Sequence, residues 1–137
     1  MVLDKLGRPL RDLRISVTDR CNFRCRYCMP REKFGSDHTF LPKSEILSYE
    51  EINRFVIACK PLGLQKVRIT GGEPLLRKDI HKLVEMISGL GIETALTTNG
   101  SLLSGQLNKL AGSGLDRLTI SLDAMDQETH SRITDST

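Results

Sequence analysis

The chain has 137 residues, of which 39% are hydrophobic and 27% charged, with a formal net charge of +3. These values indicate one globular domain, and the charge is too small to point to a nucleic-acid partner. No stretch approaches the roughly 20 apolar residues of a membrane span, and the N-terminus lacks a signal or transit composition. We therefore expect a cytoplasmic protein with no membrane partner.

In chain order, predicted strands alternate with predicted helices. Strands are expected at residues 13–18, 66–70, 92–98 and 116–122, and helices at about 49–61, 79–88 and 104–111. Ser48 and Glu51 form a capping box at the start of the first helix, and Asp126 is the expected N-cap of a fourth helix that has barely begun at Thr137. This order predicts an α/β fold, a partial (β/α) barrel of about four parallel strands.

The predicted strands are not the continuous hydrophobic runs that buried parallel strands usually are. Polar and apolar residues alternate, as in Leu13, Arg14, Ile15 and Ser16 of the first strand. Because successive side chains point to opposite faces, one face of the sheet is expected to be polar. The simplest explanation is a barrel interior that holds a polar ligand and water.

Three cysteines, Cys21, Cys25 and Cys28, follow the first predicted strand with the spacing C-x3-C-x2-C. Three thiolates this close in sequence can bind three irons of one 4Fe-4S cluster and leave the fourth iron open. A structural zinc site, or a cluster that only carries electrons, normally takes a fourth protein ligand. The remaining cysteine, Cys59, lies among apolar residues of the first predicted helix, where we expect it to be buried.

Further polar motifs follow the other predicted strands. Gly71-Gly72-Glu73-Pro74 follows the second strand, Thr97–Gly100 ends the third, and Ser121–Asp123 ends the fourth. The paired glycines let the backbone approach a ligand closely, and Pro74 favours an extended Glu73. Ligands of parallel β/α folds lie at the carboxyl ends of the strands, so these motifs and the cysteine loop are expected to meet at one rim.

The segments Asp19–Pro30 and Arg68–Pro74 resemble the radical S-adenosylmethionine (SAM) superfamily. Within it, the sequence is similar to the family of GTP 3′,8-cyclases of molybdenum cofactor biosynthesis. Leu6–Arg14, Phe40–Pro42, Leu96–Gly100 and Ser121–Ala124 support this narrower resemblance, which extends along nearly the whole chain.

The resemblance implies a fold of the radical SAM type and a 4Fe-4S cluster on Cys21, Cys25 and Cys28. At that cluster SAM is reductively cleaved to start the cyclisation of GTP to (8S)-3′,8-cyclo-7,8-dihydroguanosine 5′-triphosphate, and an electron donor must reduce the cluster. The resemblance assigns SAM contacts to Tyr27, Gly72, Glu73 and Ser121, and GTP contacts to Arg14, Arg68 and Thr97.

One feature of the family is missing from the sequence. Family members bind a second cluster through three cysteines of a C-terminal region, and no second triplet follows Cys28 here. Residues 1–137 therefore resemble the N-terminal portion of the radical SAM core domain, truncated before that region. We expect such a chain not to cyclise GTP alone, and to pair with a C-terminal half or with a second copy.

Two other interpretations remain. The first is another radical SAM enzyme, such as a glycyl-radical activase, which GTP binding at Arg14, Arg68 and Thr97 would distinguish. The second is a non-catalytic zinc or iron-sulfur module that uses Cys59 or His38 as a fourth ligand. Metal analysis together with visible absorption separates a zinc site from a cluster.

Overall fold

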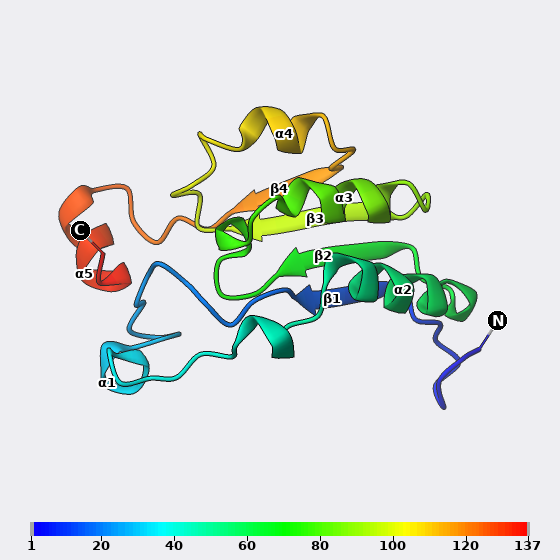
Figure 1. The fold of residues 1–137 in the computed structure, drawn as a ribbon, viewed down its shortest axis with the longest axis horizontal. Coiled ribbons are helices and arrows are strands. Elements are labelled where there is room, and N and C mark those ends of the chain that lie inside the picture. Colours follow the sequence, from blue (N-terminus) through cyan, green and yellow to red (C-terminus); the bar gives the residue numbers. More distant parts are fainter. Residues whose placement is uncertain (1, 137) are drawn as a thin grey trace.

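Four parallel strands form one open sheet in the computed structural model, which describes residues 2–136. Each strand pairs with the next one in the chain, so the sheet order is β1-β2-β3-β4 (Figure 1). The strands are β1 (Asp12–Ser16), β2 (Lys66–Thr70), β3 (Glu93–Thr98) and β4 (Arg117–Ile120). The expected α/β fold with four strands of an incomplete barrel is confirmed.

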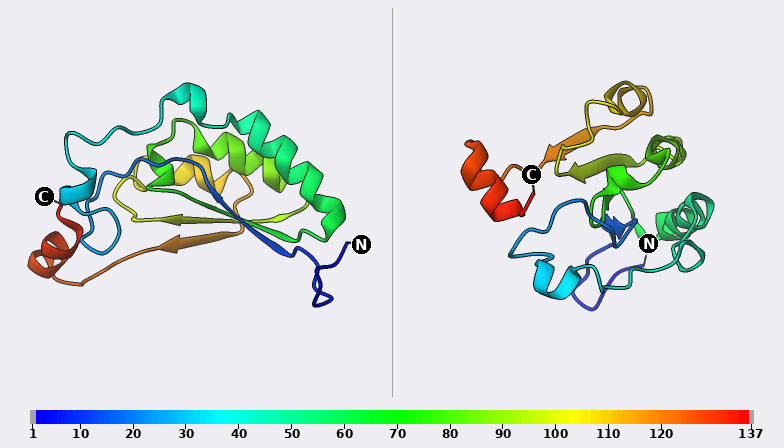
Figure 2. Two further views of the ribbon diagram at one scale, coloured as in Figure 1. Left: turned by 90° about the horizontal axis from the view of Figure 1, so that it is seen from below. Right: turned by 60° about the vertical axis from the view of Figure 1, so that its left-hand side comes forward.

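Three helices cover one face of the sheet, and two lie beyond its carboxyl end. In Figure 2, α2, α3 and α4 lie on the same side of the strands, while α1 and α5 lie past the arrowheads in Figure 1. The helices are α1 (Arg31–Phe34), α2 (Tyr49–Cys59), α3 (Ile80–Ser88), α4 (Leu107–Ala111) and α5 (Gln127–Thr134). No helix within residues 2–136 is long and apolar enough to cross a membrane.

The hydrophobic core lies between the sheet and this helical layer. Ile69 of β2 and Leu96 of β3 are fully buried, as are Val56 of α2 and Leu83 of α3, and all belong to one cluster. Each such side chain contributes roughly 1.5–3 kcal/mol by its burial. The apolar positions of β1 and β2 thus face the helices, and Arg14 and Arg68 are left on the other face.

The ends of the first long helix follow from its sequence. The Ser48 hydroxyl accepts a hydrogen bond from the backbone N–H of Glu51, and the Glu51 carboxylate accepts one from the N–H of Ser48. The helix ends at Cys59 and continues as a 3₁₀ turn that Gly63 terminates with φ of 99°. The predicted capping box is confirmed, and the left-handed Gly63 explains where the helical segment stops.

Two predicted helices differ from the structure. The third begins at Leu107 instead of residue 104, because turns that contain Gly100 and Gly105 occupy the preceding residues. The expectation of a fourth helix that has barely begun was wrong: α5 makes two turns and ends at Asp135 in the left-handed conformation. Its predicted cap is confirmed, since the Asp126 carboxylate accepts a hydrogen bond from the N–H of Thr129 at 2.8 Å.

Candidate functional site

The polar motifs that follow the four strands meet at the carboxyl end of the sheet, as predicted. The loop after β1 contacts the end of β3 through Asn22, whose side-chain oxygen accepts a hydrogen bond from Asn99 at 3.0 Å. The same loop contacts the segment after β4, because the Tyr27 hydroxyl donates to Asp123 at 2.9 Å. The parallel order of the strands therefore gathers residues from distant parts of the sequence at one rim.

The three cysteines of the loop after β1 line one cavity of about 250 Å³. Gly71 and Gly72 line it too, and all three thiols are free. Burial raises the pKa of the Cys21 and Cys25 thiols. Three soft sulfur donors around a shared cavity fit an iron-sulfur cluster, which takes thiolate ligands.

The other ligands considered for a zinc site lie elsewhere. Cys59 packs in the hydrophobic core at 6% exposure, as expected. His38 lies between the rings of Phe34 and Phe40, with centroid distances of 4.7 and 4.6 Å. Neither Cys59 nor His38 lines the cavity of the triplet, and residues 2–136 contain no group of three His, Cys, Asp or Glu side chains arranged to hold a single metal ion.

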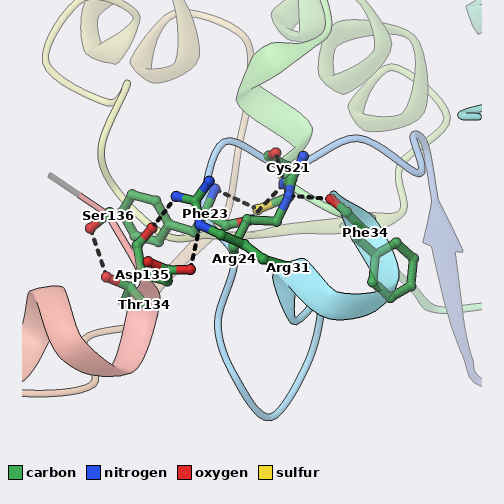
Figure 3. A network of polar contacts seen from close by, with 8 residues as sticks. All are labelled: Cys21, Phe23, Arg24, Arg31, Phe34, Thr134, Asp135 and Ser136. Carbon is green, nitrogen blue, oxygen red and sulfur yellow. Dashed lines mark hydrogen bonds and ion pairs between the residues drawn. The ribbon is translucent and has the colours of Figure 1, made fainter. Parts of the chain in front are cut away.

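Arg24 fixes the path of the cysteine loop from within. Its guanidinium donates hydrogen bonds to the backbone carbonyls of Cys21 at 2.6 Å, Phe23 at 2.8 Å and Phe34 at 2.9 Å (Figure 3). One charged side chain thus ties the start of the loop to the end of α1. The sequence motifs assigned Arg24 no individual role.

The glycine turn after β2 packs directly against the start of the cysteine loop. The N–H of Gly72 donates to the carbonyl of Thr18, and the N–H of Glu73 donates to that of Arg20, both at 2.8 Å. A Cβ atom added to Gly72 would lie 2.1 Å from the Arg20 carbonyl oxygen. Glycine is therefore required at position 72 because the backbone of the cysteine loop occupies the space of a side chain. The sequence pattern predicted a close approach of this turn, but to a ligand and not to another segment of backbone.

Glu73 anchors the glycine turn to the end of β3. Its carboxylate is buried and accepts hydrogen bonds from the Thr98 hydroxyl at 2.5 Å, the Asn99 N–H at 2.7 Å and the Leu75 N–H at 3.1 Å. A carboxylate offers about four acceptor positions, so one position remains for a further donor. The sequence placed Glu73 at a strand end but did not reveal Thr98 as its partner.

The remaining residues predicted to contact SAM lie on the exposed side of the rim. Tyr27 is 70% exposed, and desolvation together with the hydrogen bond to Asp123 raises the pKa of its phenol. Ser121 is exposed, and its N–H donates to the carbonyl of Thr98 at 2.9 Å. Both residues border the same end of the sheet as the cysteine cavity.

Arg14 and Arg68 are neighbours in the register of β1 and β2. Because the residues next to them in both strands pack in or against the core, the two arginines lie on the opposite face, which α2, α3 and α4 leave uncovered. No carboxylate within residues 2–136 forms an ion pair with either guanidinium. Like charges on directly opposite strand positions destabilise a sheet, so this pair favours an anionic ligand. Thr97 lies on the same face, one step nearer the rim, beside Thr119.

A third arginine on this face was missed by sequence reasoning. Ala95 pairs in register with both Arg68 and Arg117, so the three arginines follow one row across the sheet. The charge of Arg117 is balanced by an ion pair with Glu93, in which Nε lies 2.5 Å from Oε1. The Nζ of Lys66 lies 3.5 Å from the same carboxylate oxygen. The uncompensated charge therefore lies at the β1 and β2 side of the face.

The model of the radical SAM superfamily matches residues 15–137. The chain belongs to this superfamily. It is 57% identical over 137 residues to the GTP 3′,8-cyclase of Acidothermus cellulolyticus, an alignment that covers 98% of this chain and 38% of that protein. A GTP 3′,8-cyclase of Staphylococcus epidermidis is 56% identical and is covered to 40%. The chain thus spans about two fifths of the length of these relatives.

Solved structures show the same fold. SuiB of Streptococcus suis, in its crystal structure with S-adenosylmethionine, superposes with a TM-score of 0.75 at 24% identity, over 93% of this chain and 28% of SuiB. A second SuiB structure gives a TM-score of 0.73 at 26% identity. These likenesses show that the fold of this chain occurs as part of larger solved structures.

Proposed function

We propose that the chain is the N-terminal, cluster-binding and SAM-binding portion of a GTP 3′,8-cyclase of molybdenum cofactor biosynthesis. The observation that carries the proposal is the position of two unpaired arginines on the open face of the sheet, below a rim where three free cysteines line one cavity. The identity of more than half to proteins named for this activity supports it.

In this proposal Cys21, Cys25 and Cys28 hold a 4Fe-4S cluster, and Tyr27, Gly72, Glu73 and Ser121 hold SAM. When bound, the cluster supplies the electron that cleaves SAM. The chain itself contributes a loop that Arg24 holds in shape and a glycine turn that Glu73 anchors. Glu73 orients an ammonium group through the one acceptor position that its three hydrogen bonds leave free.

GTP binds, in this proposal, along the uncovered polar face. Arg14 and Arg68 donate paired, charge-assisted hydrogen bonds to phosphate oxygens, a role for which the planar guanidinium is well suited. Thr97 lies one step nearer the rim and contributes a hydroxyl. In this proposal GTP lies between the arginine pair and the cysteine cavity, as a reaction that starts from SAM requires.

The proposal includes further partners. An electron donor reduces the cluster, and a C-terminal half, or a second copy of the chain, covers β4, whose four residues are all exposed. The four free cysteines suit a reducing, cytoplasmic setting. No nucleic-acid or membrane partner is proposed.

Replacing Arg14 or Arg68 with glutamine is expected to weaken GTP binding by about tenfold or more, since each loses a charge-assisted hydrogen bond to phosphate. Equilibrium titration of the chain with GTP measures the effect. Arg54→Gln is the matched control, because Arg54 is an exposed arginine on α2, on the opposite side of the sheet. Equal GTP affinity in all three variants would contradict the proposal that GTP binds on the polar face.

A further inference from the structure

The segment from Asp123 to Ser136 rests on the cysteine loop, although about 100 residues separate the two in the sequence. Figure 1 shows α5 and α1 side by side beyond the sheet, and Figure 3 shows the contacts between them. Arg31 contacts Asp135 across a separation of 104 residues. No part of the proposed function assigns a role to this contact.

Two backbone hydrogen bonds join the last turn of α5 to the loop. The N–H of Arg24 donates to the carbonyl of Thr134 at 2.9 Å, and the N–H of Arg26 donates to that of Ile133 at 3.2 Å. The last carbonyls of a helix have no partner inside it, and the N–H groups of an irregular loop also need acceptors. The helix end thus supplies acceptors to the loop, and the loop supplies donors to the helix end. The two donors, Arg24 and Arg26, lie on either side of Cys25.

A charged contact holds the far end of the loop. The Arg31 Nε donates to the carboxylate of Asp135, and a second nitrogen of the same guanidinium donates to the Asp135 carbonyl at 2.9 Å. Asp135 has φ of 47°, a left-handed conformation that aspartate tolerates better than most residues. This conformation ends α5 and directs both acceptors of Asp135 to Arg31, the first residue of α1.

Aromatic and hydroxyl contacts complete the interface. The rings of Phe23 and His130 meet edge to face with a centroid distance of 5.8 Å, and Tyr27 donates to Asp123 at 2.9 Å. Thr134 is fully buried, although it lies at the end of an otherwise polar helix. Residues 123–136 therefore contact the cysteine loop at three places: between Cys21 and Cys25, between Cys25 and Cys28, and just after Cys28.

We propose that Arg31 and Asp135, together with the carbonyls of Ile133 and Thr134, form a latch that holds Cys25 in position for its cluster. This inference rests on the proposed function. Residues 17–30 contain no helix or strand, so the loop depends on contacts such as those of Arg24 and the latch for its shape. Partners outside the ligand shell commonly orient metal ligands in this way, and Arg31 and Asp135 are accordingly positioning residues.

The latch is tested with Arg31→Gln, which removes the guanidinium, and with Asp135→Asn, which keeps the side-chain size and a residue that tolerates positive φ. Amide exchange at Arg24 and Arg26 in the metal-free chain should speed up by about 3- to 10-fold. After anaerobic reconstitution, the visible absorption of the cluster should decay faster in the presence of a chelator by about the same factor. In Arg31→Lys, amide exchange and cluster decay should both be slower than in Arg31→Gln, because lysine keeps the positive charge and can still donate a hydrogen bond.

The matched controls are Arg8→Gln and Asp4→Asn, which break an exposed ion pair of 2.8 Å away from the cysteine loop. These should leave amide exchange and cluster decay unchanged, and no variant should alter the midpoint of thermal unfolding by more than the controls do. Wild-type behaviour in Arg31→Gln and Asp135→Asn overturns the latch, as does a parallel loss of global stability without rescue by lysine. If the wild-type chain takes up no cluster, the proposed function fails, and amide exchange alone decides whether the latch holds the loop.

Discussion

Replacing Cys21, Cys25 or Cys28 with alanine is expected to abolish cluster binding in each case. The proposed cluster already has one iron without a protein ligand, so the loss of a second ligand leaves only two thiolates to hold it. All three thiols line the same cavity, and none is engaged in a disulfide. Iron and sulfide content per chain after anaerobic reconstitution measures the effect, and each variant should fall to nearly zero.

Cys59→Ala is the matched control for these variants. Cys59 packs in the core between the sheet and α2, so its replacement is expected to cost roughly 1 kcal/mol of stability through lost packing and to leave the iron content unchanged. Loss of the cluster in Cys59→Ala, or its retention in any one of the three loop variants, would contradict the three-ligand assignment.

Gly72→Ala is expected to displace the cysteine loop, with a loss of roughly 1–3 kcal/mol or more in the free energy of unfolding. The new Cβ atom would lie 2.1 Å from the Arg20 carbonyl oxygen and 3.1 Å from the Cys21 nitrogen. Both contacts are with backbone atoms, which cannot rotate away as a flexible side chain can. Cluster content and SAM affinity should therefore fall together, which denaturant unfolding, iron analysis and SAM titration can measure.

Gly105→Ala provides the comparison for this substitution. The nearest atom to a Cβ atom at Gly105 is the Leu102 carbonyl oxygen at 4.0 Å, so an alanine there should be tolerated. If Gly72→Ala is as stable as Gly105→Ala and binds SAM normally, then the close packing of the glycine turn against the loop has no functional importance.

The elements of the fold could be predicted because the sequence patterns are local. Alternation in residues 66–70 gave the bounds of β2 correctly, and the Ser48 and Glu51 pair gave the start of α2. The first strand was predicted two residues too long at its end, since Val17 still donates to the Thr70 carbonyl but lies beyond the ladder. Pattern alone does not show where the ladder ends.

The candidate site was only partly predictable, because its contacts join residues far apart in sequence. The cysteine spacing and the strand-end motifs located the rim correctly. The packing of Gly72 against Arg20 and the pairing of Glu73 with Thr98 depend on how two loops meet in space. The same holds for the salt bridge of Arg31 with Asp135, since neither residue belongs to a recognisable motif.

The most direct test of the account is SAM cleavage by the reconstituted and reduced chain. The chain is incubated anaerobically with SAM, with and without GTP, and 5′-deoxyadenosine and the cyclised nucleotide are measured separately. We predict slow formation of 5′-deoxyadenosine that Cys25→Ala abolishes, and no cyclised nucleotide from this chain alone. A chain with a full complement of iron and sulfide that forms no 5′-deoxyadenosine would contradict the assignment of a SAM-cleaving site to these residues.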